Sequence, residues 1–374
     1  MGKIELDHTG AGSGVTLSSD GTDLLLNGTA IGGGGGSALE LYAENPVTPT
    51  APSATGTNAV AIGENARATG DRGMAFGSES LASGTNSIAL GRAATSSGLL
   101  SNAMGFGATA GAQSSFAMGY GAITATGLYS TSIGRSYASG ADSFAAAIAN
   151  NTSSYGATGA NSVAIGYQAK ATNASAVCIS KFSTASGTNS VVLGGSSGTA
   201  SGSGAIAIGG SSNVASGLYS TAKGSYGNTN GITKKHATGV SINMQGAYYV
   251  LAHATTDATP IALNTDVWTP SATNQVILPN NSAYFFSGTI IARQDAASGT
   301  DMGAWEIKGA IRREGSAATT TLVKSTIDDF NVPAGWAVAL TADTTNGGLA
   351  ITVTGSAATN IRWVATVSTS EVTY

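Results

Sequence analysis

A short phrase recurs twelve times between about residues 56 and 231, and it limits the possible folds of this chain more than any other feature. The phrase is a strand of alternating large and small apolar residues that ends in glycine and is followed by a polar tail, as in TNAVAIGENARATG and TNSIALGRAATSSG. A unit of about 14 residues cannot bury a core alone, so neighbouring units must stack on one another. The repeat therefore predicts a solenoid.

Two glycine columns run through the repeat. The glycine that closes the strand recurs at Gly63, Gly77, Gly91, Gly105, Gly119, Gly134, Gly166, Gly194, Gly209 and Gly224. A second column begins at Gly56 and contains Asn173 in a later unit. Glycine adopts positive φ without steric cost and asparagine tolerates it next best, so each unit should contain two tight turns. Two turns leave two short strands per unit, which predicts a β-solenoid or β-roll of about twelve coils.

The strand columns separate large apolar residues from small ones. Val60 and Ile62 are large, and Ala61 lies between them. Because side chains alternate between the faces of a strand, one face should carry large apolar groups and the other face methyl groups. We expect a second chain to pack closely against the alanine face. Cys178 occupies the alanine column, so we expect it to be a buried free thiol.

The recurring NSVAIG-like phrase, at residues 86–91, 161–166 and 189–194, resembles the head domain of trimeric autotransporter adhesins of the YadA type. The resemblance covers roughly residues 53–231 and implies a left-handed parallel β-roll, with three copies side by side around an axis. Ala147 and Ser180 depart from the family's glycine column, and Lys223 departs from the isoleucine column. One step of the repeat is longer than the others, so we expect residues 148–159 to form a protruding loop.

Residues 1–31 read as short strands around the Asp20–Gly21 dipeptide, a strong hairpin signal. Residues 32–55 are a linker that contains five consecutive glycines and three prolines. The strands followed by a hinge resemble the N-terminal attachment segments of bacteriophage fibre proteins. We therefore expect residues 1–31 to attach to a phage tail or head protein.

Residues 232–374 lose the repeat and show about eight to ten alternating strands, which predicts an antiparallel β-sandwich of the jelly-roll kind. All four tryptophans lie in this part. Trp305 and Trp363 keep step with the apolar face and are expected in the core, whereas Trp268 and Trp336 lie in loop-like contexts and are expected to be exposed. The domain resembles the C-terminal tips of phage tail fibres. The candidate receptor-binding residues are Trp268, Trp336, Gln294, Asp295, Thr300, Asp301, Asp343 and Asn346.

Composition narrows the function classes. Charged residues make up only 10% of the chain and the net charge is −4, which does not favour nucleic acid or an acidic membrane surface as a partner. The three histidines are scattered, and the sequence shows no catalytic motif, so we expect no metal, no cofactor and no enzymatic activity. We also see no signal peptide and no apolar run long enough to insert into a membrane.

These observations predict a homotrimeric phage fibre, located in the virion, with a β-roll shaft at residues 56–231 and a receptor-binding tip at residues 232–374. Its partners would be two further copies of itself, a virion protein and a bacterial surface receptor such as a glycan or an outer-membrane component. Two alternatives remain open. The first is a bacterial surface adhesin, for which we see no membrane anchor, and the second is a tailspike that cleaves surface polysaccharide.

Overall fold

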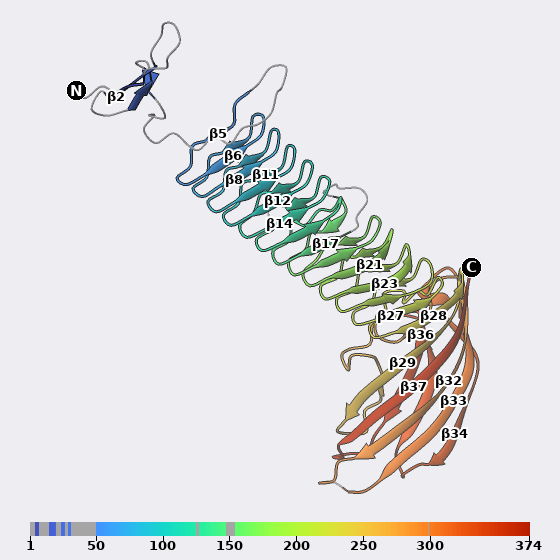
Figure 1. Cartoon of the computed structure of the whole chain (residues 1–374). Coiled ribbons are helices and arrows are strands. Elements are labelled where there is room, and N and C mark those ends of the chain that lie inside the picture. Colours follow the sequence, from blue (N-terminus) through green and yellow to red (C-terminus); the bar gives the residue numbers. More distant parts are fainter. Residues whose placement is uncertain are drawn as a thin grey trace.

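The computed structural model describes residues 50–124, 127–146, 154–297 and 299–374 with their side chains, and residues 4–6, 15–19, 24–26 and 29–30 as backbone strands. Within these ranges the regular secondary structure consists of β-strands, joined by turns, and one short 3-10 helix, η1 (Ala317–Thr319). Figure 1 shows a stack of coils followed by a fan of long strands. No helix in the described ranges is long and apolar enough to span a lipid bilayer.

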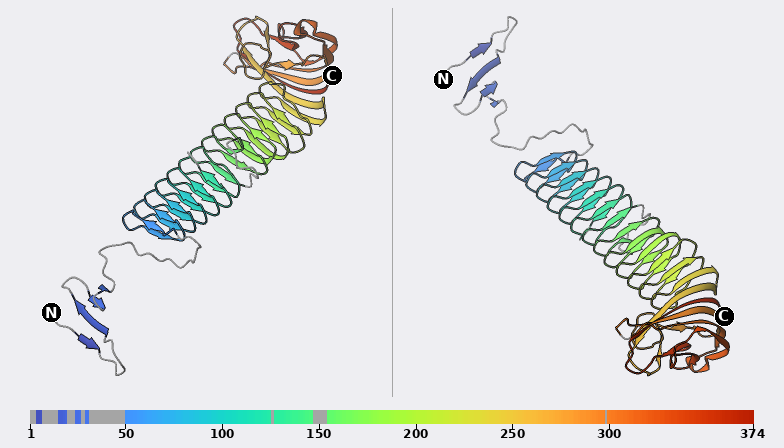
Figure 2. Two further views of the ribbon diagram at one scale, coloured as in Figure 1. Left: turned by 90° about the horizontal axis from the view of Figure 1, so that it is seen from above. Right: turned by 90° about the horizontal axis from the view of Figure 1, so that it is seen from below.

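One long parallel ladder runs through the coil stack, because each coil contributes one strand to it. These strands are β6 (Val60–Ile62), β8 (Met74–Phe76), β10 (Ile88–Leu90), β12 (Asn102–Met104), β14 (Phe116–Met118), β16 (Thr131–Ile133), β17 (Phe144–Ala146), β19 (Val163–Ile165), β21 (Val177–Lys181), β23 (Val191–Ser196), β25 (Ile206–Ile208) and β27 (Thr221–Gly224). Neighbouring strands pair in register, so that Ala89 lies beside Ala75 and Ala103. The predicted solenoid is confirmed, and Figure 2 shows the stack from two further sides.

The other side of each coil contributes a two-residue strand. A 6-stranded sheet contains β5 (Ser53–Ala54), β7 (Arg67–Ala68), β9 (Leu81–Ala82), β11 (Thr95–Ser96), β13 (Thr109–Ala110) and β15 (Ile123–Thr124). A 5-stranded sheet contains β18 (Gly156–Ala157), β20 (Lys170–Ala171), β22 (Thr184–Ala185), β24 (Thr199–Ala200) and β26 (Val214–Ala215). The break between the two sheets falls at the long step of the repeat. Residues 148–153 of the expected protruding loop lie outside the described residues.

The alanine column fills the inside of the coils, which corrects the expectation that it faces another chain. Ala75, Ala89 and Ala103 are 0% exposed within this single chain and pack against alanines of the opposite sheet, such as Ala82. The interior between two such short strands is narrow and is filled mainly by methyl and hydroxyl groups, with Cys178 and Val192 as larger members of the same column. The large apolar residues therefore point outward, and Leu90 remains 42% exposed.

Glycine is required in the two columns for different physical reasons. Every described glycine of the strand-closing column has positive φ, for example 115° at Gly63, as predicted. Gly70, in the second column, has no positive φ, but a Cβ there would lie 2.2 Å from the carbonyl oxygen of Gly84 in the next coil. Asn173 does not adopt positive φ either. In these turns the residue with positive φ lies two positions later, namely Ser175 after Asn173 and Asn58 after Gly56.

The ladder continues one strand beyond the last recognised repeat. Strand β28 (His236–Ser241) pairs in parallel with β27, and places Ala237 beside Ala222 and Gly239 beside Gly224. Strand β29 (Met244–Thr255) then pairs antiparallel with β28. The coil stack from β5 to β28, called the shaft below, is therefore joined by backbone hydrogen bonds to the C-terminal domain from β29 to β37, called the tip.

Two antiparallel sheets form the tip, in agreement with the predicted sandwich. The long sheet has the order β29, β37 (Ile361–Thr373), β32 (Ser282–Gln294), β33 (Met302–Arg313) and β34 (Thr321–Asn331). In the second sheet, β36 (Gly348–Thr354) pairs with β30 (Ile261–Ala262), β31 (Val276–Ile277) and β35 (Ala337–Asp343). The apolar core lies between them and includes Tyr249, Phe286, Trp305 and Trp363.

The N-terminal strands form a separate antiparallel sheet in the order β1 (Ile4–Leu6), β2 (Val15–Ser19), β3 (Leu24–Leu26) and β4 (Thr29–Ala30). Strands β2 and β3 pair antiparallel, as the hairpin signal predicted. The Asp20–Gly21 turn and the run of five glycines lie outside the described residues.

Candidate functional site

The predicted receptor-binding residues lie in three separate places. Gln294, Asp295, Thr300 and Asp301 lie in or beside the β32–β33 loop, at the end of the tip furthest from the shaft, which we call the distal end. Asp343 and Asn346 lie near the opposite end, where Gly347 accepts a hydrogen bond from the backbone N–H of Leu278. The structure therefore does not bring the eight residues into one site.

Trp336 is the one predicted site residue that the structure removes from the surface, since it is only 6% exposed. Its ring centroid lies 5.5 Å from that of Trp363, which in turn lies 5.5 Å from Trp305. Large aromatic rings gain most from burial in a domain core. The expectation of an exposed Trp336 was wrong because the bend after Pro333 turns this ring inward, with the Trp336 N–H donating to the Pro333 carbonyl at 3.1 Å.

The remaining predicted residues, Asp343, Asn346 and Trp268, lie near the shaft. Asp343 accepts hydrogen bonds from the backbone N–H groups of Thr345 and Asn346, both at 2.9 Å, and from the Asn346 amide at 2.8 Å. Trp268 is 75% exposed, as predicted, in a loop tied to the shaft by a bond from the Thr233 N–H to the Thr273 carbonyl. Asp343 and Asn346 thus form a closed turn, and Trp268 stays an exposed ring.

A cleft at the distal end of the tip has the properties of a small-ligand site. Its volume is about 510 Å³, within the range of such sites, and it is lined by Ala254, Thr255, Thr256, Arg293, Gln294, Asp295, Ala296, Asn360, Ile361 and Arg362. Two of the predicted residues, Gln294 and Asp295, belong to this lining. We call it the distal cleft. Its two arginines were not among the predicted residues.

Hydrogen bonds between the tip's strands and loops fix the walls of the distal cleft. The indole N–H of Trp363 donates to the Thr255 hydroxyl at 3.0 Å. The Asp295 N–H donates to the Asn360 carbonyl at 2.8 Å, which joins the β32–β33 loop to the β36–β37 loop. These bonds connect the cleft walls to one another and to the core, and a pre-formed wall reduces the conformational freedom that is lost when a ligand binds.

A buried ion pair lies at the other end of the tip, where the shaft joins it. Lys235 donates from Nζ to Oε2 of Glu371 at 2.7 Å, and its side chain is 0% exposed. The Glu371 carboxylate also accepts hydrogen bonds from Gln245 at 2.6 Å, Tyr249 at 3.0 Å and Thr369 at 2.7 Å. The structure thus pairs Lys235 with a carboxylate of its own chain.

Burial dominates the electrostatics of this junction. It lowers the pKa of the Lys235 ammonium, and the neighbouring Glu371 carboxylate offsets part of that shift. Burial also raises the pKa of the Tyr249 and Tyr284 hydroxyls well above 10.0, and the charge of Glu371 raises them further. Both rings therefore remain neutral up to strongly alkaline pH.

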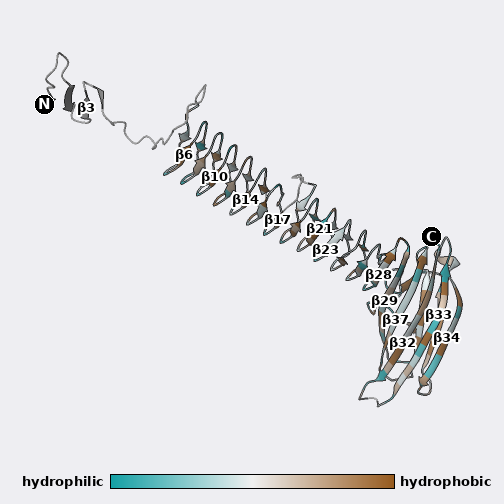
Figure 3. Cartoon of the chain, turned by 45° about the vertical axis from the view of Figure 1, so that its right-hand side comes forward, coloured by the Kyte–Doolittle hydropathy of each residue, from teal (hydrophilic) through white to brown (hydrophobic). Residues whose placement is uncertain are grey.

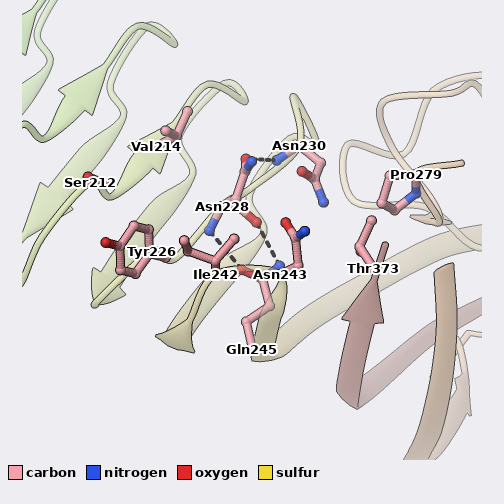
Figure 4. Close-up of a pocket in the computed structure, with 10 residues that line it drawn as sticks. All are labelled: Ser212, Val214, Tyr226, Asn228, Asn230, Ile242, Asn243, Gln245, Pro279 and Thr373. Carbon is pink, nitrogen blue, oxygen red and sulfur yellow. Dashed lines mark hydrogen bonds between the residues drawn. The ribbon is translucent and has the colours of Figure 1, made fainter. Parts of the chain in front are cut away.

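A smaller polar cavity of about 270 Å³ lies beside the ion pair and is drawn in Figure 4. Asn228 and Gln245 bond to each other across it, from the Asn228 N–H to Gln245 Oε1 at 2.7 Å and from Gln245 Nε2 to the Asn228 carbonyl at 2.8 Å. Asn228 Oδ1 accepts a further bond from the Asn230 N–H at 2.8 Å. These hydrogen bonds join the shaft to the tip. Because the amide groups bond to one another, the cavity offers few free polar groups to a ligand.

An exposed ladder of cations and aromatic rings runs along four consecutive coils of the shaft. Phe106 and Tyr120 stack at 5.2 Å, with Arg92 over the free face of Phe106 at 5.5 Å and Arg135 over that of Tyr120 at 5.6 Å. These residues all follow a strand-closing glycine, so the repeat itself aligns them. Since both ring faces are covered, the ladder stabilises the shaft and leaves no ring face for a sugar.

Cys178 lies inside the shaft, as predicted. Its side chain is 0% exposed, and burial raises the pKa of the thiol to about 11. The described residues contain no group of three side chains that could hold a metal ion.

Comparison with known proteins identifies the shaft repeat. The YadA head domain repeat matches residues 54–80, 82–99, 157–177 and 182–197. The predicted resemblance of the shaft is thereby confirmed, and the coils are YadA-like β-roll repeats. No curated protein matches the chain.

Among solved structures, one match is the tailspike protein gp49 of Acinetobacter baumannii bacteriophage Fri1, a capsular polysaccharide depolymerase. The identity is 10% and the TM-score is 0.23, and the match covers 75% of this chain but only 46% of that one. The prediction that the chain lacks enzymatic activity is contradicted by this match to an enzyme, and we withdraw it. A similarity this low transfers no activity to the chain.

Proposed function

We propose that this chain, whose shaft carries YadA-like repeats, is the subunit of a homotrimeric phage fibre that binds the bacterial surface through its tip. The observation that carries the proposal is the continuous β-sheet from shaft to tip, in which β27, β28 and β29 are hydrogen-bonded neighbours. A rigid connection of this kind holds the distal cleft at the end of a long stack of coils. The N-terminal sheet would attach the fibre to the tail or head of the virion.

Exposed apolar side chains on the shaft support the trimer. The outward-facing column of the long ladder includes Leu90, Met118, Ile179, Leu193 and Ile208, each between 39% and 42% exposed. They recur in register along the strands, and Figure 3 shows the apolar strand residues repeating along the shaft. A continuous apolar stripe of this length is typical of a surface that another chain covers. Three copies would bury these stripes against one another around a common axis.

The oligomeric state can be tested by analytical ultracentrifugation of the full chain. We expect the mass of three chains for the wild type, and dissociation when Leu193→Ser and Ile208→Ser are combined on the exposed column. Leu218→Ser is the matched control, because Leu218 is also 42% exposed but lies in a turn of the coil and not on the strand face. A monomeric wild type, or a trimer that survives the double substitution, would contradict the proposed assembly.

Host binding can be tested by adsorption of the purified fibre to a panel of bacterial strains. We expect retention on cells of the host strain and loss of retention when surface polysaccharide is stripped from them. Failure to adsorb to any strain would sink the proposed function. The supernatant of the same incubation should be analysed for released oligosaccharides, because their release would assign depolymerase activity to the fibre.

A further inference from the structure

We propose that the distal cleft binds the anionic group of an acidic surface saccharide, a carboxylate or a phosphate, between Arg293 and Arg362. This inference rests on the proposed function and specifies the chemistry of the receptor. It follows from the register of two strands, from the charges that the described residues leave unpaired, and from the polar rim of the cleft.

Strand pairing places the two guanidinium groups together. Arg293 on β32 lies directly opposite Arg362 on β37 in the antiparallel ladder. Residues in such a pair have Cβ atoms about 4.5–5.5 Å apart and point to the same face of the sheet. Their neighbours Ala292 and Trp363 are buried in the core, so both arginines point outward. The fold therefore places two cations side by side at the distal edge of the long sheet.

Neither arginine has a carboxylate partner among the described residues. Arg293 donates from Nη1 to the Thr300 carbonyl at 3.1 Å, and the side chain of Arg362 makes no hydrogen bond or ion pair with the described part of the chain. Like charges directly opposite one another destabilise a sheet. An anion placed between them would remove the repulsion and would be held by two forks of N–H donors. The planar guanidinium matches both carboxylate and phosphate in this way.

The rest of the cleft suits a sugar attached to that anion. Ala254 supplies exposed apolar surface, while Thr256, Asp295 and Asn360 supply polar groups at the rim. Hydroxyl groups of a saccharide both donate and accept hydrogen bonds, so a mixed rim of this kind can orient them. The cleft contains two cations against one carboxylate, which favours an acidic saccharide over a neutral one.

The experiment uses the full-length fibre and an array of bacterial surface polysaccharides. Each polysaccharide is immobilised in three forms, namely native, carboxyl-reduced and dephosphorylated with aqueous hydrogen fluoride. We expect the wild-type fibre to be retained on at least one acidic polysaccharide and to lose about tenfold or more of its affinity when the anionic group is removed. The form that loses retention identifies the anion as carboxylate or phosphate.

Variants assign the effect to the arginine pair. We expect Arg362→Gln to weaken retention about tenfold or more, and Arg293→Lys to weaken it less because the charge is kept. Arg312→Gln is the matched control, since Arg312 lies on the same outward face of the long sheet at the end near the shaft and should leave retention unchanged. Circular dichroism of each variant confirms folding.

Three results would overturn the inference. The first is equal retention on native, carboxyl-reduced and dephosphorylated forms, or retention on neutral polysaccharides alone. The second is equal retention of the wild type and the Arg362→Gln variant. A fibre that adsorbs to host cells yet binds no polysaccharide also overturns this inference and leaves the proposed function standing, whereas a fibre that adsorbs to no cells overturns the proposed function itself.

Discussion

The shaft and the tip are both built from β-strands, but they bury opposite kinds of side chain. Inside the shaft are methyl and hydroxyl groups such as those of Ala89 and Ser101, and the large apolar residues face outward. Inside the tip are the rings of Tyr249, Phe286 and Trp363, each 0% or 1% exposed. The difference follows from thickness, because two sheets one methyl deep cannot enclose a ring, whereas two sheets packed face to face lie about 10 Å apart.

This comparison shows where each region obtains its stability. A buried aromatic side chain removes about 150–250 Å² of surface from water, far more than an alanine does. The tip can therefore bury a large apolar area within one chain. A single coil of the shaft buries little and depends on its neighbouring coils, and its exposed apolar column offers the further burial that an assembly of chains would supply.

The largest expected effect concerns the junction, where the two regions meet through a buried charge. Glu371→Gln would leave the Lys235 ammonium without its partner, and breaking a buried pair in this way costs about 3–5 kcal/mol. We expect the midpoint of urea unfolding of the tip to fall accordingly. Fluorescence isolates the tip, because all four tryptophans lie between residues 268 and 363.

The matched control is an exposed pair on the same long sheet. Lys308 Nζ and Asp328 Oδ2 lie 3.9 Å apart, with more than half of each side chain exposed. Such surface pairs contribute about 0–1 kcal/mol, so Asp328→Asn should change the midpoint little. An equal loss of stability in both variants would show that the junction is not specially dependent on its buried pair.

The second prediction tests how strictly the shaft interior is limited to small groups. Ala103→Leu adds three carbons to a space already filled by Ala89 and Ala117, and overpacking of this kind costs about 1–3 kcal/mol. We expect faster hydrogen exchange of backbone amides in the adjacent coils. Met104→Leu, on the outward side of the same strand, should leave exchange unchanged. Normal protection in the Ala103→Leu variant would mean that the interior is wider than the structure shows.

Much of the shaft was predictable from sequence, because each coil repeats the same short-range geometry. The positions of Gly63 and Ala61 in their columns were sufficient to predict two turns and the alternation of faces. What the columns could not reveal was which face is inside, since that depends on the distance between two sheets. One further coil was missed, although Ala237 and Gly239 continue the alanine and glycine columns at a spacing of 15 residues from Ala222 and Gly224.

The tip was predictable as a sandwich but its site was not. Asp295 lies next to a turn and could be proposed from sequence, whereas Arg293 and Arg362 are 69 positions apart and become neighbours only through the pairing of β32 with β37. The one available signal was that each arginine interrupts an apolar strand on its outward face. Trp336 failed for the opposite reason, because a residue near a proline can still turn into a core that is formed by distant strands.

The third prediction uses pH to compare the tyrosine-lined junction with the rest of the tip. Tyr249 and Tyr284 have pKa values raised well above 10.0 in the folded chain, so above about pH 10 the folded state binds more protons than the unfolded state and stability falls as pH rises. Each tyrosine contributes a slope of up to about 1.4 kcal/mol per pH unit. Lys235 acts in the opposite direction, because its lowered pKa makes stability rise with pH, and this gain ends near the unfolded value of 10.5.

Above about pH 10.5 the two tyrosines therefore dominate, and the unfolding free energy of the tip should decrease steadily. Tyr284→Phe removes one of the two protons from this balance and should reduce the slope by up to about 1.4 kcal/mol per pH unit. Tyr248→Phe is the control. Tyr248 precedes Tyr249 on β29, points outward and is 42% exposed, so its substitution should leave the slope unchanged. Urea unfolding at several alkaline pH values measures the slope of the unfolding free energy against pH. An identical slope in the Tyr284→Phe variant would show that Tyr284 loses its proton in the folded tip as readily as in the unfolded chain, so that burial at the junction does not hold it neutral.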